Sequence, residues 1–194
     1  MDENGLRYAA AGTTLLLLAS VGARSLRLRR AGVPVNQLGA KGNFSQRALV
    51  ALAPVFAGYL AARAPFPAID ALVAARPSPA PAAALAIMIL ASFLIIIAQG
   101  GMGKSWRVGV PSGEGDVDRL VTGGLNKLSR NPTYLGIMLF LIGAALAAPG
   151  PLTAGAIVIT FALLSAVIDK EEKYLRSRFG AEYDAYARRV RRWI

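Results

Sequence analysis

Residues 131–168 read NPTYLGIMLFLIGAALAAPGPLTAGAIVITFALLSAVI and contain no Asp, Glu, Lys or Arg. A helix needs about 20 residues to cross the ~30 Å hydrocarbon core of a bilayer, so this run is too long for one crossing. Pro149-Gly150-Pro151 interrupts the run, and adjoining Pro and Gly residues mark a turn. The run therefore predicts a tight hairpin of two membrane-spanning helices, residues 133–148 and 152–168.

Three further uncharged apolar stretches precede this hairpin, at residues 8–23, 48–62 and 80–102. The second is only about 22 Å long as a helix, but the long side chains of the flanking Arg47 and Arg63 can reach the interface. The segment that follows Arg63 is rich in Ala and Pro and indicates a short external connector. We therefore predict a single all-α domain over residues 1–194, an integral membrane bundle of five transmembrane helices.

The first stretch differs from a cleavable signal peptide. Two acidic residues, Asp2 and Glu3, and a single basic residue, Arg7, precede its apolar core, and an Arg-rich segment follows the core. Signal peptides carry their basic residues before the apolar core, so we expect a retained helix.

The basic residues predict the orientation of the bundle. In the five-helix arrangement, only Arg7, Arg63 and Arg76 of the 22 Lys and Arg residues fall on one side of the membrane. Lys and Arg concentrate on the cytoplasmic side, so this distribution predicts an N-terminus outside and a C-terminus in the cytoplasm. We accordingly expect the protein in the cell (inner) membrane, in contact with the lipid bilayer.

The composition excludes many kinds of site. The chain has 0 Cys and 0 His, which rules out disulfides, zinc fingers, Cys nucleophiles and Ser-His-Asp triads. A formal net charge of +11 can indicate nucleic-acid binding, but 55% of the residues are hydrophobic and no groove-reading motif is present. We therefore expect no nucleic-acid partner and no metal.

The segment Ser129-Arg130-Asn131-Pro132-Thr133 opens the first helix of the hairpin. Asn131 suits an N-cap and Pro132 suits the first helical position, while Arg130 is an ordinary interfacial residue. The same helix start offers free backbone N–H groups beside a guanidinium, which is suited to an anionic group such as a carboxylate. Both interpretations remain open from these residues alone.

Glu171 and Glu172 follow the second helix of the hairpin. Adjacent helical residues point about 100° apart, so only one of the two easily faces a given pocket. A solvated helix face, with Lys170 and Lys173 as partners, is the alternative. Residues 179–194 then predict an amphipathic tail helix on the cytoplasmic surface, with its aromatic side chains at the level of the lipid headgroups.

These residues favour a reaction that needs little acid–base catalysis. A carboxylate is already ionised near neutral pH, because its reference pKa is about 4. Methyl transfer from a sulfonium donor to such a nucleophile can depend mainly on positioning and on desolvation.

Four ordered motifs carry a family resemblance: DRLVTGGLN at 118–126, SRNPTYLG at 129–136, the pair Glu171-Glu172, and FGAEYDAY at 179–186. With the hairpin between them, they resemble the isoprenylcysteine carboxyl methyltransferase family, and the layout is similar to that of the phospholipid N-methyltransferases. The resemblance runs from about residue 105 to the C-terminus and implies a cofactor-binding core over about 103–194.

The resemblance implies S-adenosylmethionine as the cofactor, bound between the hairpin and the tail. It implies a lipophilic small-molecule or prenylated acceptor, foremost a carboxylate, and roles at the reacting groups for Arg130 and Asn131. The cofactor contacts that it implies are Leu120, Val121, Asn126, Asn131, Pro132, Thr133, Tyr134 and Glu171.

Three positions depart from the isoprenylcysteine enzymes. Those enzymes have His where this chain has Asn131, Tyr where it has Asn126, and Arg where it has Val167. The Arg serves the substrate carboxylate there, so Val167 bears on the acceptor more than on the cofactor.

Two other functions are compatible with the sequence. Sterol and steroid reductases have a similar C-terminal helical core, which makes an NADPH-dependent membrane reductase one alternative. The other is a non-catalytic scaffold whose basic face contacts anionic lipid.

Overall fold

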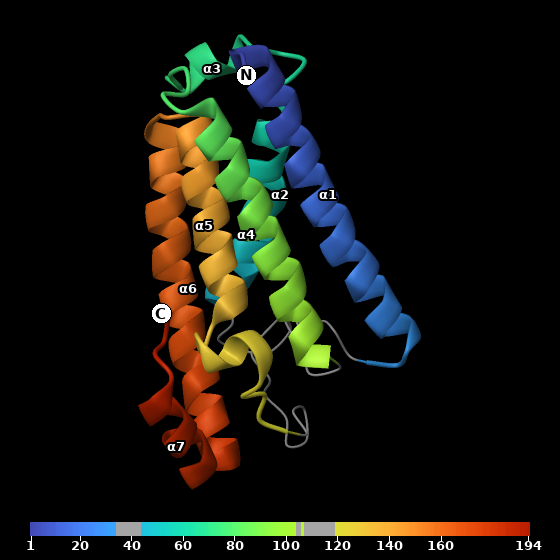
Figure 1. Cartoon of the computed structure of the whole chain (residues 1–194), viewed down its shortest axis with the longest axis vertical. Coiled ribbons are helices and arrows are strands. Elements are labelled where there is room, and N and C mark those ends of the chain that lie inside the picture. Colours follow the sequence, from blue (N-terminus) through green and yellow to red (C-terminus); the bar gives the residue numbers. More distant parts are fainter. Residues whose placement is uncertain (34–43, 104–105, 107–118) are drawn as a thin grey trace.

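The computed structural model describes residues 1–33, 44–103, 106 and 119–194. Within these residues the chain forms helices and connecting turns, with no strand. Lys104 and Arg107, which follow the third apolar stretch, lie outside the described residues, as does Asp118, the first residue of the motif DRLVTGGLN. The helices are α1 (Glu3–Arg30), α2 (Phe44–Ala62), α3 (Ile69–Leu72), α4 (Pro81–Met102), the 3₁₀ helix η2 (Gly124–Lys127), α5 (Pro132–Ala147), α6 (Pro151–Phe179) and α7 (Ala181–Arg189) (Figure 1).

In the described chain, α1, α2, α4 and α6 are long and apolar enough to cross a membrane, and α5 is a shorter apolar helix of 16 residues. Each predicted span falls on one of these five helices. The prediction of an all-α integral membrane protein is therefore confirmed. At 1.5 Å per residue α5 is about 24 Å long, less than the ~30 Å hydrocarbon core, so five full crossings stay a prediction.

The predicted hairpin is confirmed by the turn between α5 and α6. Pro151 lies in the first turn of α6, where it disrupts no helical hydrogen bond. A Cβ atom on Gly150 would lie 3.0 Å from both the Ala74 carbonyl oxygen and the Ala75 Cα. The Arg76 backbone N–H donates to the Pro149 carbonyl at 2.7 Å. The turn is thus held against the connector that follows α3, and glycine is needed for the close approach.

Small residues let α4 and α5 pack closely. A Cβ atom on Gly143 would lie 2.9 Å from the Met88 backbone nitrogen and 3.1 Å from the Ala84 carbonyl oxygen. Gly136 faces the Ala91 carbonyl in the same way, at 3.3 Å. Between apolar helices in lipid, close backbone contact of this kind replaces the hydrophobic effect as the source of association.

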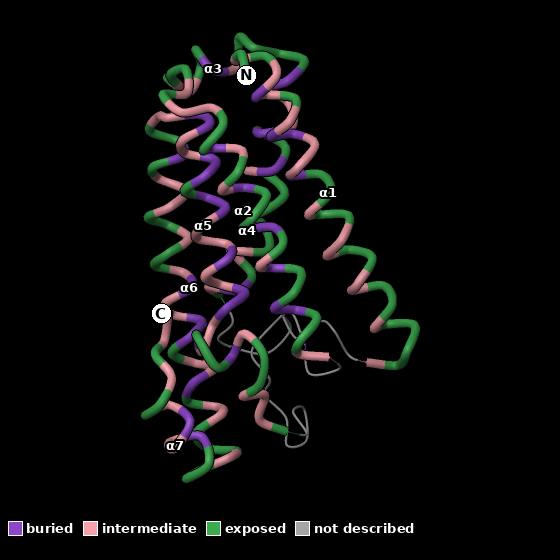
Figure 2. The backbone as a smooth tube through the Cα atoms, viewed as in Figure 1, coloured by how far each residue is buried: buried purple, intermediate pink, exposed green. Residues whose placement is uncertain are grey.

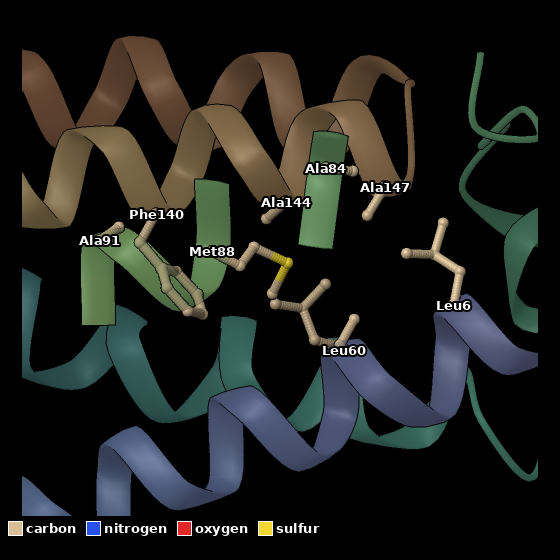
Figure 3. Packing of buried hydrophobic residues seen from close by; sticks show 9 residues of the cluster. Leu6, Leu60, Ala84, Met88, Ala91, Phe140, Ala144 and Ala147 are labelled. Carbon is tan, nitrogen blue, oxygen red and sulfur yellow. The ribbon is translucent and has the colours of Figure 1, made fainter. Parts of the chain in front are cut away.

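The core extends from this helix pair toward α1 and α2. Met88 of α4, Phe140 of α5, Leu60 of α2 and Leu6 of α1 belong to one buried cluster, and Figure 3 shows Phe140 and Leu6 toward its opposite ends. Buried residues follow α4 and α5, whereas the outer faces of the helices are exposed, as expected for lipid-facing surfaces (Figure 2). Away from the N-terminus, α1 leans outward from the other helices (Figure 1).

A buried ion cluster joins the N-terminal end of α1 to the end of α2 and to α3. The Arg63 side chain is 1% exposed, and its Nη2 donates to Asp70 Oδ2 at 3.0 Å. Arg7 Nη2 donates to the same oxygen at 2.8 Å. Burial alone would raise the pKa of Asp70, but the hydrogen bonds and charges of Arg63 and Arg7 outweigh burial and lower the pKa below its ordinary value. Sequence analysis placed Arg63 at the interface, whereas the structure buries it, because Asp70 lies opposite it.

We predict that Gly143→Ala destabilises the protein by about 1–3 kcal/mol, since its added methyl group overlaps the backbone of α4. Gly155→Ala in α6 is the matched control, because nothing lies within 4 Å of a Cβ there. Thermal unfolding in detergent measures both. Equal melting temperatures for the two variants would contradict the close contact between α4 and α5.

We predict that Asp70→Asn lowers the free energy of unfolding by roughly 3 kcal/mol, because it removes the carboxylate that binds both the buried Arg63 and Arg7. Glu3 is then the remaining acid near them, at the longer distances of 3.6 Å from Arg63 and 3.8 Å from Arg7. The control is Asp184→Asn, which removes an ion pair whose two side chains are 54% and 43% exposed and which is worth about 0–1 kcal/mol.

The same cluster predicts a pH dependence. Since the pKa of Asp70 is lowered on folding, its stabilising contribution is complete above its ordinary value of about 4 and is lost as pH falls through the lowered pKa. The melting temperature of the wild type should therefore fall more steeply than that of Asp70→Asn on acidification below pH ~4. Parallel pH profiles would contradict the assignment.

Candidate active site

A pocket of about 180 Å³ lies at the end of the bundle opposite the N-terminus. We call it the polar pocket. Its walls come from the segment before α5, the first turn of α5, the end of α6, and α7. Sequence-predicted residues that line it are Leu120, Val121, Asn126, Arg130, Asn131, Thr133, Tyr134 and Glu171. Pro132 is the exception, because it is fully buried in the first turn of α5 and does not reach the pocket.

The start of α5 differs in one respect from the sequence prediction. Pro132 is in the first turn as predicted, but the Asn131 side chain makes no capping hydrogen bond. Asn131 Nδ2 instead donates to the Arg192 carbonyl at 3.0 Å. Asn131 therefore occupies the N-cap position as predicted, but its side-chain amide binds the C-terminal segment instead of capping the helix.

Tyr134 and Glu171 connect the two helices of the hairpin. Since α5 and α6 are antiparallel, the third residue of α5 lies opposite a residue near the end of α6. The Tyr134 hydroxyl donates to Glu171 Oε1 at 2.7 Å, which is a short hydrogen bond. Glu171 thereby presents a fixed carboxylate to the polar pocket.

Glu172 is the buried member of the glutamate pair, with 9% exposure. Its Oε1 lies 3.0 Å from Arg130 Nη2, and its Oε2 accepts from Arg192 Nη2 at 2.7 Å. The expectation that only one glutamate faces the pocket is wrong, because both line it. The alternative of a solvated face paired with lysines fails for Glu172, since the returning C-terminal segment supplies Arg192.

The chain returns over α6 because of a turn at Gly180, whose φ of 50° is a left-handed conformation that favours glycine. The following helix covers Ala181–Arg189, so the predicted tail helix ends earlier than residue 194. Tyr183 and Tyr186 are 1% and 4% exposed and line the polar pocket. Their predicted place among lipid headgroups is therefore wrong. An amphipathic stripe looks the same whether it covers lipid or protein.

The Tyr186 hydroxyl ties α7 to η2 by donating to the Asn126 carbonyl at 2.8 Å. Burial raises the pKa of Tyr186 above its ordinary value, so this hydroxyl keeps the proton that it donates. Asn126 itself is buried. Wall residues that the sequence did not assign to the site are Met102, Trp106, Arg119, Glu172, Tyr174, Leu175, Tyr183 and Tyr186. The available signals for the two tyrosines were their spacing and their place in the motif FGAEYDAY.

A second cavity, of about 600 Å³, lies among α1, α2, α4, α5 and α6. We call it the apolar chamber, because most of its wall consists of aliphatic and aromatic side chains. Its volume falls in the usual range of ligand sites, about 300–1,000 Å³. Val167, at the position of the family's arginine, is part of this wall and 1% exposed. Among the described residues, the chamber and the polar pocket share Trp106, Thr133 and Tyr134.

Among the described residues, two buried polar atoms in the wall of the polar pocket lack a hydrogen-bond partner: Arg130 Nε and Thr133 Oγ1. More than nine-tenths of buried polar groups in folded proteins are paired, so two such atoms in one pocket point to a ligand. A guanidinium N–H binds an anion, and a threonine hydroxyl can donate or accept. Within the described residues, no group of three or more Asp or Glu could hold a metal ion.

Several curated proteins are similar in sequence to part of this chain. A protein from Oryza sativa subsp. indica named "Probable protein-S-isoprenylcysteine O-methyltransferase" is 34% identical over 76 residues, 39% of this chain and 40% of that protein. "Protein-S-isoprenylcysteine O-methyltransferase B" of Arabidopsis thaliana is 34% identical over 73 residues, 37% of each chain. An uncharacterized protein of Haemophilus influenzae is 37% identical over 62 residues, 31% of this chain and 98% of that protein.

The matched segment thus spans about 40% of the length of the plant relatives. No solved structure matches the chain. A family model described as phospholipid methyltransferase matches residues 80–182. That range runs from the start of α4 to the first turn of α7 and includes both helices of the hairpin, the helix start at Asn131 and the glutamate pair. The chain belongs to the phospholipid methyltransferase family.

Proposed function

We propose that this chain is an S-adenosylmethionine-dependent methyltransferase that acts on a lipophilic acceptor in the membrane. One observation carries the proposal: the polar pocket and the apolar chamber meet at Trp106, Thr133 and Tyr134. Methylation of a lipid-like molecule brings a water-soluble donor and an apolar acceptor into contact. A polar site and an apolar site with a common wall meet that requirement.

The polar pocket has groups that match the charges of the donor. The donor carries a carboxylate, an ammonium group and a sulfonium. Arg130 Nε and the free N–H groups at the start of α5 suit the carboxylate. Glu171, fixed by Tyr134, suits a positive group. The proposed donor site is completed by Leu120, Val121, Asn126 and Asn131. Pro132 does not line the pocket and contributes by shaping the first turn of α5.

When bound, the donor supplies a methyl group on a positively charged sulfur. The acceptor nucleophile forms a bond to that carbon as the carbon–sulfur bond breaks, and the electron pair of that bond returns to sulfur. The protein's part is to align the two molecules and to exclude water. Such a role needs neither His nor Cys, of which the chain has 0 each.

We propose a carboxylate as the acceptor group, as the names of the plant relatives suggest. An ionised carboxylate needs no base to remove a proton. Val167 offers no charge to it. We assign the contact instead to Thr133, which lines both cavities. Its Oγ1 has no hydrogen-bond partner among the described residues and can donate to an acceptor oxygen.

The orientation is part of the same proposal. The last turns of α1 and α7 carry Arg27, Arg29, Arg30, Arg188 and Arg189, all at the end of the bundle that holds the polar pocket. Basic residues concentrate on the cytoplasmic side. We therefore place this end, with the C-terminus, in the cytoplasm and the N-terminus outside, in the cell (inner) membrane.

The test is transfer of a tritiated methyl group from S-adenosylmethionine by the purified protein in detergent. We expect N-acetyl-S-farnesylcysteine to gain a base-labile methyl ester and dodecylamine to remain unlabelled. Label on dodecylamine alone would contradict the carboxylate assignment. No label on either probe or on a total membrane-lipid extract would contradict the proposed function.

In the same assay, Glu171→Gln should lower kcat/KM by roughly 10- to 100-fold, because it removes a charge beside the donor and keeps a group that Tyr134 can bind. Glu182→Gln, at an exposed position of α7, is the control and should match the wild type. Equal activities of the two variants would exclude Glu171 from the site.

A further inference from the structure

The last residues of the chain form a strap that is bonded to the segment before α5 and to α6, beside residues that line the polar pocket. Val190 leaves the helical conformation, with φ −120° and ψ 128°. The Arg130 backbone N–H donates to the Arg191 carbonyl at 3.0 Å. Ser129 Oγ and Asn131 Nδ2 donate to the Arg192 carbonyl at 3.3 and 3.0 Å. The strap is therefore bonded to the start of α5 through its backbone.

The Arg192 side chain extends the strap to α6. Its Nε and Nη2 donate to the two carboxylate oxygens of Glu172 at 3.2 and 2.7 Å, and its Nη1 lies 3.0 Å from Asp169 Oδ1. A bidentate arginine–carboxylate pair of this kind is stronger and more directional than a single contact. One residue of the strap thus joins both helices that carry the donor site.

Glu172 is shared between two guanidinium groups. Arg130 Nη2 lies 3.0 Å from the same carboxylate that Arg192 binds bidentately. The other contact of the Arg130 side chain is long, 3.4 Å from Nη1 to the Ala187 carbonyl, and its buried Nε has no partner. Arg130 therefore lines the polar pocket with a guanidinium whose Nε N–H still lacks an acceptor among the described residues.

We propose that Arg192 is a positioning residue that neutralises Glu172 and so keeps Arg130 available to bind the carboxylate of the donor. This inference rests on the proposed function. With Arg192 present, the cluster of Asp169, Glu172, Arg130 and Arg192 is neutral overall. Without it, Glu172 keeps Arg130 as its ion-pair partner, and Asp169 loses the contact to Arg192. Arg130 is then held on Glu172, and the net negative charge of the cluster repels an incoming carboxylate.

The test compares two ligands that differ in the carboxylate-bearing part. S-adenosylhomocysteine has the amino-acid group, and 5′-methylthioadenosine has the same nucleoside and sulfur without it. Titration calorimetry in detergent gives both dissociation constants. We expect Arg192→Gln to weaken S-adenosylhomocysteine binding about tenfold and to change 5′-methylthioadenosine binding by less than about twofold.

Two variants make the result specific. Arg192→Lys keeps the charge without the bidentate geometry and should restore most of the S-adenosylhomocysteine affinity. Arg189→Gln removes an exposed charge from α7 and should leave both affinities at the wild-type value. Melting temperatures of all variants show whether the fold is kept.

Equal loss for both ligands in Arg192→Gln, or no loss for either, would overturn the positioning role while the proposed function stands. Wild-type protein that binds neither ligand would overturn the proposed function and this inference together.

Discussion

The hydrogen bond between Tyr134 and Glu171 fixes the geometry on which the site depends. It pairs the first turn of α5 with a residue near the end of α6, at 2.7 Å. Because α6 has 29 residues and α5 has 16, α6 continues about two turns beyond this contact. That extension carries Glu172 and ends at Gly180, where α7 turns back. The length difference between two hairpin helices thus creates the polar pocket.

The sequence was sufficient for the parts set by local pattern. The charge-free run with its Pro-Gly-Pro break predicts the hairpin, and the ordered motifs contain most of the residues that line the polar pocket. The sequence did not predict the structure correctly where one pattern is compatible with two structures. The stripe of Tyr183 and Tyr186 fits a lipid surface as well as a protein surface. Hydropathy also cannot separate a side chain that faces lipid from one, such as Val167, that faces an internal chamber.

Charge pairing between side chains of different segments was also not predictable from the sequence. Arg63 looked like an interfacial residue, yet Asp70 neutralises it in a buried cluster. Glu172 looked solvated, yet two guanidinium groups from distant segments contact it. In both cases the partner is selected by the path of a short, irregular segment, and such paths depend on tertiary contacts. These two clusters lie at opposite ends of the bundle. Both are therefore outside its apolar middle, the region in which an unpaired charge would be most costly.

The central claim is that the polar pocket binds S-adenosylmethionine or its product. Calorimetric titration of the purified wild-type protein in detergent with S-adenosylhomocysteine, and with NADPH in a parallel experiment, tests that claim most directly. We expect saturable one-to-one binding of S-adenosylhomocysteine and no binding of NADPH. Binding of NADPH alone would instead support a membrane reductase, and the absence of binding by either ligand would support a non-catalytic scaffold; both results would contradict the account.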